Sequence, residues 1–497
     1  VAPDDLHPER TVRARLETVT DPALRAPGLE ALDELEAARD AVRVAASAGD
    51  GRVAAALGAL DDTFTRLTGS TATRRDGEAY AGRTLVYEDC LRGDELSLGT
   101  AALDALREPL ALLLEAARWF TAAGAALVHR ACLDIYRTRA AELGTNLVPL
   151  AEFWLLAQEL IFHPPASVIG PLVRNLQDRW ARILALPPGE RRVTVHSAQL
   201  RQQVRDAFVV ARPGWAGAVH HSPDLMLCTG DGGWVLGELH PGVNTLRYAS
   251  RVAYHPDPGL LRRAAAADVG GSAVVLAPSA ELGTRARQFN GLLDPGHPWL
   301  VFAHDTSGYD PARTLLVGDC DLVEAAGRLV VRHRSGRPPL DLIEVIADAV
   351  SMELTQHFKV LPPARHAPRV SLDALVVHRE TWTFAPDELP FAGVPDESAR
   401  FLAIRRWAGE HSLPRYAFVR ATGERKPIFI DLASLASADL LSRAVRRARR
   451  QPDPVVTVTE MLPAPDQLWL TDAGGAPYTC ELRICAVDRR YATSASR

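Results

Sequence analysis

Lysine is almost absent from this chain, which carries only Lys359 and Lys426 and draws nearly all of its positive charge from arginine, a bias typical of a GC-rich genome. No apolar run approaches the roughly 20 residues that span a bilayer, and the stretch from Leu106 to Leu114 is interrupted by Arg107 and Glu108. No secretory signal opens the sequence. We therefore expect a cytoplasmic protein without a membrane span.

The six cysteines are scattered and form no CxxC pair, which argues against a zinc site and against a disulfide framework. The motifs GxSxG, GxxxxGK[ST] and a GxGxxG after a strand are also missing. Their absence disfavours an enzyme that hydrolyses nucleotides or performs redox chemistry. We predict no metal and no resident cofactor, so an acyl donor would have to arrive already activated.

The 497 residues carry a net charge of −5, which argues against a protein that coats nucleic acid. A local basic patch that grips one RNA remains open. The length predicts about three domains. We expect an α+β fold: 1–188 mainly helical with a short β insert, 189–345 β-rich, and 346–497 an α/β subdomain with a terminal β-hairpin.

Apolar residues at helical spacing predict helices, and alternating β-prone runs between turn residues predict strands. The expected helices cover 29–38, 101–114, 151–162, 342–353, 397–411 and 437–450. The expected strands cover 192–196, 224–228, 234–240, 299–302, 314–317, 328–331, 369–377, 416–420 and 428–432, with a hairpin in 460–483.

A carboxylate and an imidazole lie two residues apart in one expected strand, at Glu238 and His240. Residues at this spacing point to the same side of a strand. Such a pair can act as acid and base or bind a metal, and His220 and His221 could come close to it. The alternative is a structural hydrogen-bonded pair.

Arginines gather on the last expected helix, at Arg443, Arg446, Arg447 and Arg450. Arg443, Arg446 and Arg450 are three and four residues apart and share a face, which could grip phosphates through salt-sensitive contacts. The alternative is a solvated helix face.

Two further arginines flank one expected strand, which begins at Arg369 and ends before Arg379. Arginines at strand ends can bind a carboxylate or a phosphate. Ordinary surface charges are the alternative.

Several short blocks, in their order and spacing, resemble the lantibiotic dehydratase family. They are Thr63–Gly69, Gly82–Cys90, Pro149–Trp154, Ser222–Leu227, Gly237–His240, Pro368–Val370 with Trp382, Pro427–Asp431 and Glu460–Arg483. In that family a large N-terminal region transfers glutamate from glutamyl-tRNA to serine or threonine side chains of a precursor peptide. A separate region then eliminates the glutamate to leave a dehydroamino acid.

The resemblance implies a transferase that uses charged tRNA as co-substrate and a precursor peptide as partner. It implies that arginines hold the tRNA end and the glutamyl carboxylate. Candidates for these contacts are Arg83, Arg369, Arg379, Arg443, Arg446, Arg447 and Arg450, and the catalytic candidates are Glu238, His240 and Asp431. An aminoacyl ester is already energised, so the site need mainly position two substrates and stabilise an oxyanion.

The resemblance covers the later part of the glutamylation region. We therefore expect that the N-terminal end of that region, which would precede Val1, is missing. We also expect that the chain has no room for an elimination domain and that a separate enzyme performs the elimination. A homodimer is left open. A variant of the family attaches an amino acid from tRNA to a peptide C-terminus, and this sequence also suits that reaction. A third hypothesis is a non-catalytic module that binds a precursor peptide along a sheet edge.

Overall fold

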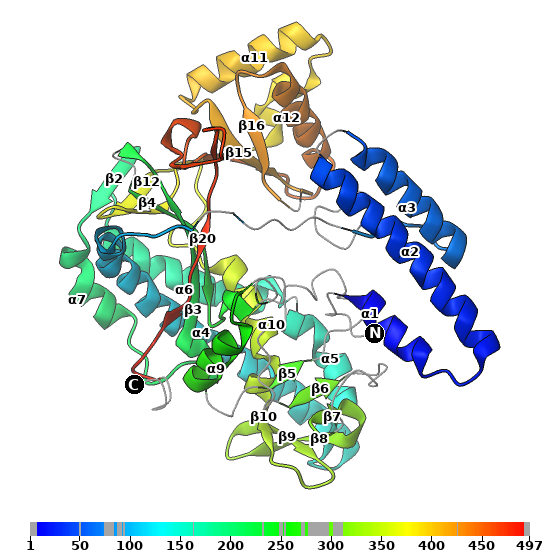
Figure 1. Ribbon diagram of the computed structural model, residues 1–497. Coiled ribbons are helices and arrows are strands. Elements are labelled where there is room, and N and C mark those ends of the chain that lie inside the picture. The colour runs from blue at the N-terminus through cyan, green and yellow to red at the C-terminus, as the bar shows by residue number, and fades with distance from the viewer. Residues whose placement is uncertain are drawn as a thin grey trace.

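The predicted α+β fold is confirmed: the computed structural model contains several separate sheets with helices packed on them (Figure 1). The structure describes residues 7–48, 51–73, 84–86, 92, 95–162, 164–230, 233–247, 252, 255–269, 274–276, 298–301, 312–424 and 426–491. Helices α1–α6 lie between Pro8 and Leu184, within the range 1–188 for which a mainly helical subdomain was predicted.

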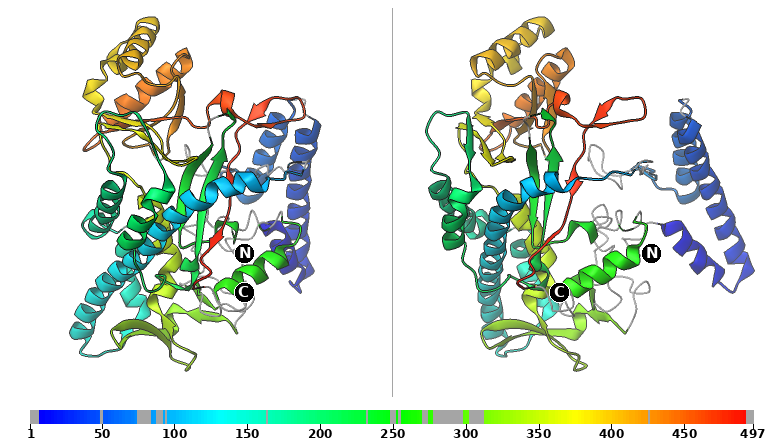
Figure 2. Two further views of the ribbon diagram at one scale, coloured as in Figure 1. Left: turned by 90° about the vertical axis from the view of Figure 1, so that its left-hand side faces the viewer. Right: turned by 60° about the vertical axis from the view of Figure 1, so that its left-hand side comes forward.

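Three helices at the N-terminal end form an arm that lies beside the body of the molecule (Figures 1 and 2). They are α1 (Pro8–Glu17), α2 (Pro22–Ala48) and α3 (Val53–Thr68). Ion pairs tie α1 to α2, with 2.7 Å between Arg13 Nη2 and Asp33 Oδ1. Helix α3 ends at Gly69, whose φ of +66° places it in the left-handed region that terminates many helices.

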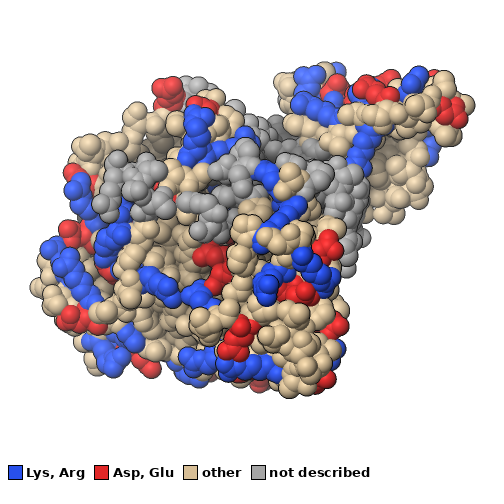
Figure 3. Space-filling view, turned by 90° about the horizontal axis from the view of Figure 1, so that it is seen from below, with Lys and Arg blue, Asp and Glu red and all other residues tan. Residues whose placement is uncertain are grey.

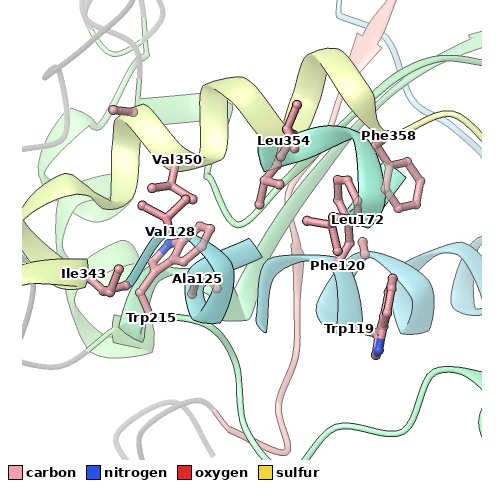
Figure 4. Close-up of a cluster of buried hydrophobic side chains, with 14 of the residues drawn as sticks. Trp119, Phe120, Ala125, Val128, Leu172, Trp215, Ile343, Val350, Leu354 and Phe358 are labelled. Atoms are coloured by element: carbon pink, nitrogen blue, oxygen red, sulfur yellow. The ribbon is translucent and has the colours of Figure 1, made fainter. Parts of the chain in front are cut away.

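The long helix α4 (Thr100–Leu143) forms the centre of the molecule, and α5 (Leu150–Phe162), α6 (Ala166–Leu184), α7 (Ser197–Ala207) and α10 (Leu342–His357) pack on it. Figure 4 shows aromatic and aliphatic side chains of α4 facing α10. The Phe120 and Phe358 rings meet edge to face at 5.7 Å, an arrangement that adds to the free energy of apolar burial.

Helix α4 is much longer than the predicted 101–114. Among the described residues it is the one helix whose length and composition would allow it to cross a membrane, and 61% of its apolar window is buried inside the protein. Its interior residues Ala116, Ala117 and Phe120 have no exposed surface, so its apolar length builds the protein core.

A seven-stranded sheet packs one face on α4 and α10. Its order is β2 (Arg192–Val195), β12 (Arg369–Leu372), β13 (Leu375–His378), β4 (Trp234–Pro241), β3 (His220–Leu227) and β20 (Leu482–Arg483), with β21 (Ala486–Val487) also on β3. The β2–β12 and β13–β4 pairs are parallel and the other pairs are antiparallel. The sheet thus takes strands from both 189–345 and 346–497.

The single strand predicted over 369–377 is wrong. A tight turn at Asp373, whose φ is +48°, splits this stretch into the antiparallel strands β12 and β13. The predicted hairpin of β3 and β4 is confirmed.

A five-stranded antiparallel sheet has the order β11 (His366–Ala367), β14 (Thr381–Phe384), β17 (Val456–Glu460), β15 (Tyr416–Ala421) and β16 (Ile428–Asp431). Helices α11 (Glu397–Glu410) and α12 (Leu435–Ala448) cover one of its faces. Alternate residues of β15, Ala417 and Val419, are buried against them. The predicted hairpin of β15 and β16 and both helices are confirmed.

Smaller sheets complete the fold. One is β1 (Val148–Pro149), β8 (Cys320–Ala325), β9 (Arg328–His333) and β10 (Leu340–Asp341); another is β5 (Val275–Leu276), β6 (Trp299–Val301) and β7 (Thr314–Leu316). Helix α9 (Pro258–Val269) lies nearby, and the predicted terminal hairpin is formed by β18 (Leu470–Thr471) and β19 (Pro477–Tyr478).

Candidate functional site

The two large sheets meet where β12 begins and β17 ends, and an arginine–carboxylate pair joins them there. Arg369 Nε donates to Glu460 Oε1 over 2.7 Å, and its Nη2 donates to Glu460 Oε2. The same Oε1 accepts from the backbone N–H of Glu380 at 2.8 Å. Glu460 is buried, and its hydrogen bond to Arg369 raises the pKa of that guanidinium.

A second buried carboxylate, Glu380, lies beside the first. Arg191 Nε donates to Glu380 Oε1 over 2.6 Å, and His366 Nε2 is 2.9 Å from the same oxygen. Arg191, Arg369, Glu380 and Glu460 line one cavity of about 460 Å³. Arg192 also lines this cavity, and its exposed side chain has no ion-pair partner among the described residues. The cavity therefore combines neutralised arginine–glutamate pairs with one available cation.

The predicted partner arginine, Arg379, lies on the same side of the molecule because β12 and β13 form a hairpin. Its Nη2 donates to the Leu462 carbonyl over 3.2 Å, while its Nε has no hydrogen-bond partner. Burial lowers the pKa of this guanidinium, and the nearby Glu460 partly offsets that effect. Arg369 and Arg379 thus both lie near Glu460. The carboxylate that Arg369 binds in this structure is a side chain of the protein, whereas the sequence predicted that of a substrate.

The predicted Glu238–His240 pair lies on β4, with 3.9 Å between His240 Nε2 and Glu238 Oε2. His240 is closer to Asp224 on the neighbouring strand, at 3.1 Å. Lys359 Nζ is 3.8 Å from Glu238 Oε1. Glu238 therefore lies between an imidazole and an ammonium group and keeps 38% of its side chain exposed.

Lys359 follows α10 and lies beside Glu238. Its side chain keeps 54% of its surface exposed, yet the protein that surrounds it lowers the pKa of the amine by burial, offset in part by Glu238. Arg420 and Arg379 lower this pKa further. Lys359 is thus paired with the Glu238 carboxylate and lies within electrostatic reach of two arginines.

The two other predicted histidines, His220 and His221, form hydrogen bonds with residues other than Glu238 and His240. His220 Nε2 lies 3.0 Å from Asp268, and His221 Nδ1 accepts from the Gly242 N–H at 3.1 Å. His221 is fully enclosed, and burial lowers its pKa to about 3.

The predicted base Asp431 ends β16 and is held by Arg415 through two hydrogen bonds of 3.0 Å each. This pairing lowers the pKa of Asp431, which makes it a weaker base than an unpaired carboxylate.

The arginines predicted to form one basic face lie on α12 and, in the case of Arg450, just after its end, and they differ in their surroundings. Arg443 pairs with Asp439 and Arg447 with Glu424. Arg446 donates to the Ala392 carbonyl at 2.7 Å. The exposed side chain of Arg450 has no partner among the described residues. Only part of the predicted basic face is therefore available to a ligand.

Arg83, the last of the predicted binding residues, lies outside the described residues, and so does most of the Gly82–Cys90 block. The described part of the chain holds no group of three His, Cys, Asp or Glu side chains able to bind a metal ion. Sequence reasoning missed Glu380, Glu460 and Lys359. Glu460 begins one of the blocks quoted above and Glu380 lies near Trp382, whereas Lys359 belongs to none of them, and Arg191, Arg369 and Glu238, with which they pair, are distant in sequence.

Comparison with solved structures finds a similar fold in two proteins. The TbtB glutamylation domain from thiomuracin biosynthesis aligns with a TM-score of 0.56 and 19% identity over 95% of this chain. The tRNA-dependent lantibiotic dehydratase MibB from Microbispora sp. 107891 aligns with a TM-score of 0.50 and 14% identity over 94% of this chain.

The chain has the fold of a lantibiotic dehydratase glutamylation domain. It spans 62% of the TbtB chain and 49% of the MibB chain. No family model matches the sequence, and no curated protein matches it either. The resemblance inferred from short sequence blocks is therefore confirmed at the level of the glutamylation-domain fold.

Charge is mixed on the face of the molecule that Figure 3 shows. Seen from below, lysine and arginine side chains are interspersed with aspartate and glutamate (Figure 3). This side is therefore not a uniformly basic surface.

Proposed function

We propose that this chain transfers glutamate from glutamyl-tRNA to serine or threonine side chains of a ribosomally made precursor peptide. The observation that carries the proposal is the fold shared with the TbtB glutamylation domain over 95% of the chain. The Glu238–Lys359 pair supports it, because a carboxylate and an ammonium group lie 3.8 Å apart at a partly exposed position, within electrostatic reach of Arg420 and Arg379.

In this reaction the peptide hydroxyl oxygen attacks the ester carbonyl carbon of the charged tRNA. Glu238 accepts the hydroxyl proton. The carbonyl oxygen becomes an oxyanion, which the Lys359 ammonium stabilises. The bond to the terminal ribose oxygen then breaks, and the proton held by Glu238 passes to that oxygen. None of these reaction steps requires a metal ion or a nucleophilic side chain of the protein.

The test is mass spectrometry of a precursor peptide incubated with the chain and glutamyl-tRNA. Uncharged tRNA is the control. A gain of one glutamyl unit on a serine or threonine side chain supports the proposal. A gain at the peptide C-terminus would replace it with the ligase reaction.

If peptide binds with no change in mass, with this chain and with a front-extended form alike, the non-catalytic binding module is the better description. A search for a separate enzyme that eliminates glutamate is justified only once side-chain glutamylation has been observed.

A further inference from the structure

The five-stranded sheet has a second face that α11 and α12 do not cover. Along β15, Ala417 and Val419 point to the helices and are buried, while Tyr416, Phe418 and Arg420 alternate with them and point to the other side. This second face is called the open face below.

Aromatic side chains from two neighbouring strands meet on the open face. Phe418 pairs across β15 and β16 with Phe429, and their ring centroids are 6.3 Å apart. The Tyr416 ring lies nearly parallel to Phe429 at 6.2 Å. Phe429 keeps 45% of its surface exposed. An exposed aromatic cluster on a sheet offers flat surfaces to a ligand.

The rest of the open face is polar. On the neighbouring strands, Thr457 and Thr459 lie opposite Arg420 and Phe418, and Thr381 and Thr383 lie opposite these threonines on β14. No aliphatic side chain occupies these described positions. A surface that docks another protein usually buries aliphatic groups with its aromatic ones, so this composition disfavours a protein partner.

Positive charge on the open face exceeds the negative charge available to neutralise it. Arg415 lies over the Tyr416 ring at 4.8 Å and neutralises Asp431. Arg420 is exposed and has no carboxylate partner among the described residues. It lies close enough to Lys359 to lower the pKa of that amine. The surplus is complementary to an anion.

We propose that the open face binds a single-stranded RNA segment, with bases stacked on Phe418 and Phe429 and a phosphate held by Arg420. Four-stranded sheets with surface aromatics on one face and two helices on the other bind single-stranded RNA in this manner, because every base has a ring face that can stack. The inference rests on the proposed function, in which the segment is the unpaired 3′ end of the charged tRNA.

The first measurement is fluorescence anisotropy of a labelled ten-nucleotide single-stranded RNA with the full chain. Phe429→Leu keeps the apolar bulk and removes the ring, so stacking predicts a loss of affinity of about tenfold or more. Arg420→Gln should reduce the salt dependence of binding by about one phosphate contact. Leu402→Ala is the control, because Leu402 is 62% exposed on α11, outside the open face.

Binding by Phe429→Leu as tight as that of the parent chain would overturn the proposal, and so would an equal loss in Leu402→Ala. The oligonucleotide assay needs neither precursor peptide nor charged tRNA. Glutamyl transfer without ring-dependent RNA binding would therefore overturn the open-face inference alone. Ring-dependent RNA binding without transfer would leave that inference standing and overturn the proposed function.

Discussion

Arg369 and Glu460 join the two large sheets of the molecule, since the first residue of β12 holds the last residue of β17 through paired hydrogen bonds. Only 5% of the Glu460 side chain is exposed. The pair therefore links the part of the chain that carries Glu238 to the part that carries the open face.

Replacing Arg369 with alanine should destabilise the protein strongly. Glu460 would remain as a buried carboxylate with only a backbone donor, and breaking a buried pair from one side typically costs about 3–5 kcal/mol. Urea unfolding followed by tryptophan fluorescence measures the change.

The matched control is Arg137→Ala. Arg137 also holds a glutamate, Glu324, through two hydrogen bonds, but 57% of its side chain is exposed. Exposed pairs contribute little, so an equal shift of the unfolding midpoint in both variants would contradict this role for the Arg369–Glu460 pair.

Stability should fall in mild acid because of His221. Its pKa is lowered by burial to about 3 from an ordinary 6.5. Below pH 6.5 this histidine takes up a proton in the unfolded chain but not in the folded chain. The free energy of unfolding therefore decreases by about 1.4 kcal/mol per pH unit as the pH falls toward 3. Above pH 6.5 its contribution is fully retained.

His221→Asn tests this pH dependence. The asparagine oxygen can accept the Gly242 N–H in place of Nδ1, and asparagine does not titrate. We expect the variant to lose less stability than the parent chain between pH 7 and pH 5 in urea unfolding. Parallel losses in the two proteins would assign the acid sensitivity to other groups.

Glu238→Gln should abolish most glutamyl transfer. Removing a general base slows a reaction by about 10²–10⁴-fold, while peptide and tRNA binding should change little. Single-turnover kinetics measures the rate. Glu159→Gln is the control because Glu159 is exposed on α5, and a comparable loss there would count against a specific role of Glu238.

The arginines in and just after α12 should separate into two groups. Arg450→Ala should reduce the slope of tRNA affinity against salt by about one contact without changing stability. Arg446→Ala should instead destabilise the fold by about 1.5–3 kcal/mol, because the guanidinium binds the Ala392 carbonyl. Filter binding at several salt concentrations, with thermal unfolding of the same samples, distinguishes them. Indistinguishable variants would argue against RNA contact at Arg450.

Local patterns were enough to predict most elements of the fold. Alternating apolar residues predicted the β3–β4 and β15–β16 hairpins, and proline residues after Phe162 predicted the end of α5. The pattern could not reveal the turn at Asp373, because β-prone residues continue on both sides of it. It also could not give the full length of α4, whose charged residues suggested an interrupted segment.

The candidate site was predictable only in part. Glu238 and His240 are close because they share a strand, and their spacing predicts this. Lys359 reaches Glu238 from beyond α10, and Glu460 reaches Arg369 from another sheet. Such contacts depend on tertiary packing, so no local pattern in the sequence encodes them.

The strand order of the seven-stranded sheet also bears on how the chain acquires its structure during synthesis. Ala486 pairs with His221, and Leu482 pairs with Leu225. Until those late residues leave the ribosome, β3 is an unprotected edge strand, and such edges recruit other chains. Contacts so distant in sequence also slow folding. Low temperature should therefore favour recovery of this protein over its aggregation, because apolar association weakens on cooling.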